Sequence, residues 1–100
     1  MDRNFITEVD KIVDLIIDDL SEEKRESITN TSKEKLFLFH IGIGSYIRNK
    51  YIYQTDLIDL YKDYRKKQDD YNQMIFKFFE GTPDALSTLI IEKIHDKLIS

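Results

Sequence analysis

The chain has 100 residues, of which 41% are hydrophobic and 34% charged, and this composition predicts one globular domain over residues 1–100. The absence of cysteine excludes disulfides, thiol catalysis and zinc–thiolate sites. The formal net charge is −4, and residues 1–26 carry nine acidic and four basic side chains, which disfavours general nucleic-acid binding by that segment.

The sequence lacks features of an exported or membrane-spanning protein. Its first ten residues have no apolar stretch of the kind found in secretory signals. The longest apolar run, around residues 36–47, is too short to cross a bilayer. We therefore expect a cytoplasmic protein with no membrane partner.

Hydrophobic side chains recur at three- and four-residue spacing along the chain, which predicts an all-α fold, a compact bundle of five or six helices. The first helix is predicted over residues 4–20, and Ser21 is placed to cap a short second helix over residues 22–28. The outer face of the first helix carries an acidic row: Asp10, Asp14, Asp18 and Asp19. Solvation alone explains such a row, whereas binding of a basic protein partner is the functional alternative.

The third helix is predicted over residues 33–50, with a capping box between Thr31 and Glu34 and with Ser32 as a competing cap. Gly42 and Gly44 lie inside it. We expect neighbouring backbones to approach both glycines closely, which would make this helix the covered centre of the bundle. A pocket opened by Gly44 is the alternative.

Cap residues divide the rest of the chain into three helices. Thr55 or Asp56 can cap a fourth helix, and Gly81 can end a fifth. The Thr82-Pro83 pair is typical of a helix start and predicts a last helix that ends near residue 99.

Two polar residues interrupt the third helix. His40 lies in the middle of its apolar face, where a buried, hydrogen-bonded imidazole is the structural interpretation and a catalytic base is the functional one. Arg48 can cap carbonyl groups near the helix end, or a carboxylate such as Asp84 or Asp56 can hold its guanidinium. Asn49 is suited to ending the helix.

Other functional signatures are absent from the sequence. It contains no phosphate-binding loop, nucleophile elbow or kinase motif, and its two histidines lack metal-ligand spacing. The segment YKDYRKK, residues 61–67, combines tyrosines with basic side chains, but nearby aspartates offset its charge, so nucleic acid is not an expected partner. We predict no catalytic residue, no metal and no cofactor.

The segment LFLFHIGIGSYIRNKYIY, residues 36–53, resembles the central motif of a small bacterial family known only as a domain of unknown function. That motif is a His, then small and apolar residues with a Gly, then Ile-Arg-Asn. The segment TPDALSTLIIEKIHDKL, residues 82–98, is similar to the family's closing block of Pro-Asp, Ser and His. Many relatives carry tryptophans after Arg-Asn, where this chain has Tyr51 and Tyr53.

The resemblance covers less than half of the chain and implies important positions rather than a chemistry. If the last helix packs on the third, Arg48 would pair with Asp84, and His40 would approach Ser87 or His95. The candidate polar cluster is therefore His40, Arg48, Asn49, Asp84, Ser87 and His95.

Small size, acidity, a helical fold and the lack of catalytic motifs favour a protein-interaction module without enzymatic activity, such as an immunity- or antitoxin-type inhibitor that masks another protein. The alternative is a domain that binds an anionic small molecule, or acts on one, at His40, Arg48 and Asp84. A homodimer built through an apolar helix face is a third interpretation.

Overall fold

The computed structural model describes residues 4–100, and every regular element in that range is helical. The elements in chain order are α1 (Phe5–Asp19), α2 (Glu22–Thr29), the 3-10 helix η1 (Lys33–Phe39), α3 (Ile43–Ile47), the π-helical η2 (Arg48–Ile52), α4 (Leu57–Lys66), α5 (Gln73–Ile75), the π-helical η3 (Phe76–Glu80) and α6 (Pro83–Ile99). The helix η2 continues α3 without a break, and η3 continues α5. The all-α bundle predicted from the sequence is confirmed.

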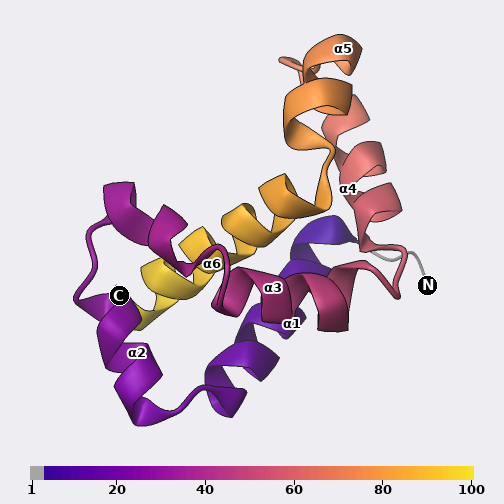
Figure 1. Cartoon of the computed structure of the whole chain (residues 1–100). Helices are drawn as coiled ribbons and strands as arrows, with labels where there is room; N and C mark the ends of the chain where they lie inside the picture. Colours follow the sequence, from indigo (N-terminus) through magenta and orange to yellow (C-terminus); the bar gives the residue numbers. More distant parts are fainter. Residues whose placement is uncertain (1–3) are drawn as a thin grey trace.

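Helix α6 is the centre of the bundle, and α1, α2, η1 and α3 all pack against it (Figure 1). Its buried aliphatic side chains are Leu86, Ile90, Ile91 and Ile94, each 2% exposed or less. The prediction that the third helix would occupy the centre is therefore wrong. The last helix has that place because it is longer and is apolar on several sides, whereas α1 and α4 are strongly amphipathic.

The predicted starts of the first, second and last helices are present. The Oδ1 of Asn4 accepts from the amide of Ile6 at 2.9 Å at the start of α1. The Oγ of Ser21 accepts from the amide of Lys24 at 3.2 Å, and the Oγ1 of Thr82 accepts from that of Ala85 at 3.1 Å. These local signals were readable from the sequence because a cap needs only its own helix.

The helix predicted over residues 33–50 is broken at residues 40–42. The backbone of Gly42, at φ −74° and ψ −84°, leaves the helical region, and α3 starts at the next residue. The predicted capping box is also wrong, because the hydroxyl of Thr31 donates to the carbonyl of Ser27 at 2.7 Å, while Ser32 is the N-cap without a side-chain hydrogen bond.

The break changes which apolar side chains of this region are buried. A 3-10 helix repeats every three residues, so Leu36 and Phe39 face the protein, with Leu36 buried and Phe39 half-buried. Phe37, Leu38 and Ile41 point to solvent, and Ile41 is 83% exposed. The expectation that both faces of this segment would be covered is therefore wrong.

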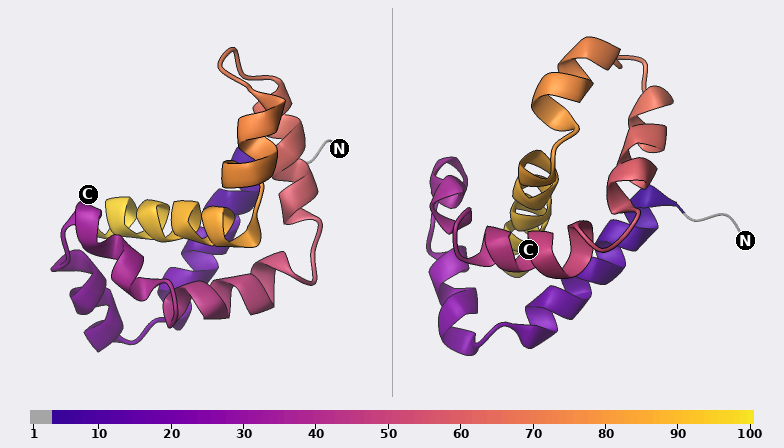
Figure 2. Two further views of the ribbon diagram at one scale, coloured as in Figure 1. Left: turned by 45° about the horizontal axis from the view of Figure 1, so that its top comes forward. Right: turned by 45° about the vertical axis from the view of Figure 1, so that its right-hand side comes forward.

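Helix α4 and the α5–η3 segment form a hairpin that projects from the rest of the bundle (Figures 1 and 2). Phe5 of α1 stacks on Tyr61 and Tyr64 of α4, with ring centroids 4.8 and 5.2 Å apart, and this contact fixes the base of the hairpin. Within residues 4–100, no helix is both long and apolar enough to cross a membrane.

Candidate functional site

Arg48 is the centre of a polar cluster that joins the end of η1, the start of η2 and the first turns of α6. Its guanidinium donates to the Oγ of Ser87 at 3.1 Å and to the carbonyl oxygen of His40 at 3.2 Å. Its Nε lies 3.4 Å from a carboxylate oxygen of Asp84. Arg48 and Asp84 are thus neighbours, as packing of the last helix on the third predicted.

Gly44 makes room for this arrangement. A Cβ atom on Gly44 would lie 3.0 Å from the Nη1 of Arg48 and 3.4 Å from the carbonyl oxygen of Phe39. The guanidinium therefore folds back over a bare backbone to reach η1 and α6. A Cβ atom on Gly42 would have no neighbouring atom within 4 Å. The close approach predicted at both glycines is therefore present only at Gly44.

The cluster has a buried centre and an exposed edge. The side chain of Arg48 is 11% exposed and Ser87 is fully buried, whereas the carboxylate side chain of Asp84 is 65% exposed. The Nε2 of His40 lies 3.9 Å from that carboxylate. Because Arg48 already donates to protein acceptors, an anion that bound its guanidinium would have to displace them.

Two residues predicted for the cluster lie outside it. Asn49 is exposed on the far side of η2, where its amide is 3.5 Å from the Oγ of Ser45. His95 is buried two turns after Ser87 on α6, and its Nε2 donates to the carbonyl oxygen of Thr31 at 3.0 Å. His95 therefore ties α6 to the loop before η1.

Two of the four aspartates in the acidic row on α1 form ion pairs within the protein. All four members are exposed: Asp10, Asp14, Asp18 and Asp19. Asp14 forms an ion pair with Lys97 of α6. Asp19 accepts from the hydroxyl of Tyr46 at 3.0 Å and lies 3.4 Å from the ammonium of Lys50. Hydrogen bonds with Tyr46 and Asp19 raise the pKa of Lys50 above its usual value.

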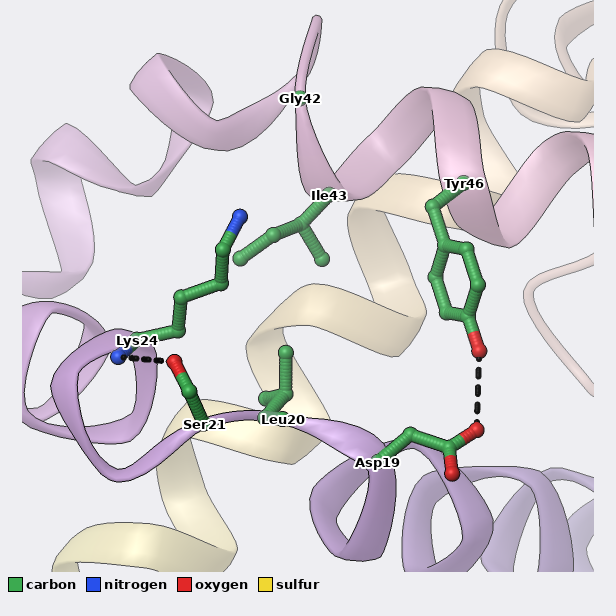
Figure 3. Close-up of a pocket in the computed structure, with 7 residues that line it drawn as sticks. All are labelled: Asp19, Leu20, Ser21, Lys24, Gly42, Ile43 and Tyr46. Carbon is green, nitrogen blue, oxygen red and sulfur yellow. Dashed lines mark hydrogen bonds between the residues drawn. The ribbon is translucent and has the colours of Figure 1, made fainter.

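A groove that the sequence analysis did not predict lies between the α1–α2 corner and the start of α3 (Figure 3). Its volume is about 410 Å³ and its lining residues are Asp19, Leu20, Ser21, Lys24, Gly42, Ile43 and Tyr46. A second cavity of about 190 Å³ shares Lys24, Gly42 and Ile43 with it and extends to Leu38. The two cavities together form the α2–α3 groove.

The sequence did contain one signal for this groove. Seven of the eight residues in LFLFHIGI, residues 36–43, are apolar or glycine, which is more than one face of a helix can bury. The excess apolar residues were assigned to a covered core. In the structure Phe37, Leu38 and Ile41 are exposed, and Leu38 lines the smaller cavity with Gly42.

No group of three or more histidine, aspartate or glutamate side chains in residues 4–100 is arranged to hold a metal ion. Comparisons with protein-family models, with curated proteins and with solved structures give no match to this chain. The resemblance to a bacterial family of unknown function therefore stays a prediction that rests on two sequence blocks.

Proposed function

We propose that this chain is a small protein-interaction module that binds its partner at the α2–α3 groove. The observation that carries the proposal is the exposure of Phe37, Leu38 and Ile41, of which Leu38 lines that groove. Soluble domains rarely leave adjoining large apolar side chains in water, and such patches are typical of interaction sites.

The shape of the groove supports this use. Leu20 and Ile43 line the larger cavity, Leu38 lines the smaller one, and Gly42 contributes to both without a side chain. A large apolar side chain of a partner would fit beside Gly42, and its burial would provide the central contact of the interface. The ammonium group of Lys24 and the hydroxyl hydrogen of Ser21 would supply donors around it, whereas the hydroxyl of Tyr46 already donates to Asp19.

Charge on α1 supports a basic partner and an inhibitor of the immunity or antitoxin type. Asp10 and Asp18 are exposed on this helix, and Asp19, which is paired with Lys50, lines the groove. Carboxylates at the edge of an interface accelerate association with a basic protein more than they raise affinity. The acidic row would then guide the partner, and the apolar groove would hold it.

The alternative function, binding of an anionic small molecule or catalysis at His40, Arg48 and Asp84, has weaker support. The donors of Arg48 already contact His40 and Ser87, and its side chain is nearly buried. A binding site for a free anion would need donors that await a ligand. We therefore favour binding of a protein over catalysis.

Site-specific photo-cross-linking in cells of the source organism tests the proposal. A photoreactive residue in place of Leu38 should yield one adduct of defined mass, whereas the same residue in place of Thr7, exposed on α1, should not. Excess unlabelled wild-type chain should suppress the adduct, and an excess of Ile41→Asp should not. Failure to form an adduct, or equal suppression by both competitors, would contradict the proposal.

A further inference from the structure

The projecting hairpin carries a second apolar surface that the proposed function does not use. Inside the hairpin, the buried Phe76 packs on Tyr61 and Tyr71, with ring centroids 5.2 and 5.9 Å apart. Arg65 adds contacts to Asp70 at 3.0 Å and Glu80 at 3.1 Å. The side of α5–η3 that faces α4 therefore holds these contacts, beside a cavity of about 270 Å³ lined by Phe76 and Lys77 among others, and the large exposed apolar side chains lie on its outer side.

Four large apolar side chains form one stripe along that outer side: Met74, Ile75, Phe78 and Phe79. Their spacing of one, four and five residues places them on one face of a helix, away from Phe76. Phe78 is 63% exposed and Phe79 is 75% exposed. We call these four residues the hairpin stripe.

The apolar area of the hairpin stripe can be compared with the area that a dimer interface buries. Side chains of about 200 Å² each, exposed by half to three quarters, present about 500 Å² of apolar surface in total. The largest apolar patch of a typical monomer is about 300–600 Å², and a stable dimer buries about 800 Å² on each partner. The hairpin stripe thus supplies more than half of the area that a stable dimer buries on each partner.

The charge of the hairpin is compatible with binding a second copy. Residues 57–81 contain five acidic and five basic side chains, so the net charge of −4 lies entirely in the rest of the chain. Two hairpins can therefore meet without net repulsion, whereas the acidic α1 surfaces of two copies would repel each other. A neutral surface also gives neither an anionic membrane nor a strongly charged partner an electrostatic advantage.

We propose that the hairpin stripe is the interface of a two-fold symmetric homodimer, in which α5–η3 of one copy packs on α5–η3 of another. A two-fold interface uses the same surface on both copies, which is the commonest arrangement in soluble oligomers. The α2–α3 groove is built from other elements and stays open in each copy. The dimer would present two grooves, so that a repetitive or dimeric partner would bind with increased avidity.

Sedimentation velocity of the full chain tests the dimer over about 1 to 100 μM, the range in which weak dimers dissociate. The expected mass at high concentration is twice the 12.0 kDa of the monomer. The double variant Phe78→Ser/Phe79→Ser should stay monomeric at every concentration, and the matched Phe37→Ser/Leu38→Ser variant should still dimerise. A monomeric wild type, or a dimer that persists in the hairpin variant, would overturn the proposal.

A cross-linking measurement keeps the result interpretable if the serine variant folds poorly. The chain has no cysteine, so Phe79→Cys introduces the only thiol, and mild oxidation should link two copies through it. Ile41→Cys, in the other apolar surface, is the control and should remain mostly unlinked. Equal linkage of the two variants would indicate random collision and would refute the interface.

Discussion

Replacement of Arg48 by methionine should lower the free energy of unfolding by about 1–3 kcal/mol. Methionine is unbranched and fills the space of the arginine stem, so the main loss is that of the guanidinium group and its hydrogen bonds. The carbonyl oxygen of His40 loses its donor, which costs about 1–3 kcal/mol for a partly buried acceptor. Ser87 loses little, because its hydroxyl still donates to the carbonyl oxygen of Asp84 at 2.9 Å.

The exposure of the Asp84 carboxylate explains why the loss of stability in Arg48→Met is not larger. Removing one partner of a fully buried ion pair costs about 3–5 kcal/mol, since the other charge is left without water. Asp84 is 65% exposed and remains hydrated when Arg48 is removed, so its share should stay below about 1 kcal/mol. We therefore expect hydrogen bonds to neutral acceptors, rather than the ion pair, to account for most of the effect.

Urea denaturation followed by far-ultraviolet circular dichroism measures the total loss of stability in Arg48→Met and, through Asp84→Asn, the share that the ion pair contributes. Asp84→Asn should cost less than about 1 kcal/mol, which includes the loss of a carboxylate from the first turn of α6. Lys33→Met, which removes the exposed pair with Asp96, is the matched control and should change stability by less than about 1 kcal/mol. If Asp84→Asn destabilised the chain as much as Arg48→Met, the ion pair would dominate and the reasoning would be wrong.

Three further predictions use the same denaturation assay. Gly44→Leu should destabilise the protein by about 1–3 kcal/mol, because the new side chain meets Arg48. Gly42→Leu places its side chain in open space and should cost less than about 1 kcal/mol. Equal costs for the two variants would contradict this prediction. Thr82→Ala should cost about 1 kcal/mol through the lost cap of α6, and Ser32→Ala, whose side chain caps nothing, should cost much less. Burial raises the pKa of Tyr61, so the folded state favours its neutral form and the free energy of unfolding should fall as the pH rises above 10. Tyr61→Phe should reduce this fall. An unchanged slope of the unfolding free energy against pH would refute the assignment to Tyr61.

The sequence predicted the features that depend on short-range interactions. Ser21 and Thr82 cap their helices as expected, because a cap is formed within one turn. The pairing of Arg48 with Asp84 was predicted from one assumption about packing, that the last helix lies on the third, and that assumption holds.

The break at residues 40–42 was not predictable by the same reasoning. The apolar residues of this region fit a 3.6-residue repeat well enough to suggest one helix, and the 3-10 geometry of η1 emerges only with tertiary packing. Exposure of Phe37 follows from that change of period, and exposure of Ile41 accompanies the break at residues 40–42. The hairpin stripe was missed for a related reason, since its residues form an apolar face that the sequence alone assigns to a core.

One hydrogen bond connects the polar cluster to the turn beside the α2–α3 groove. The guanidinium of Arg48 holds the carbonyl of His40, two residues before Gly42, which lines both cavities. Loss of that hydrogen bond would free the turn between η1 and α3 and widen the range of positions open to Leu38 and Ile41. An interface built on a mobile turn loses affinity through the entropy of ordering it. If the α2–α3 groove is the binding site, Arg48 would contribute to binding as well as to stability, because its hydrogen bond to His40 would hold the turn beside the groove.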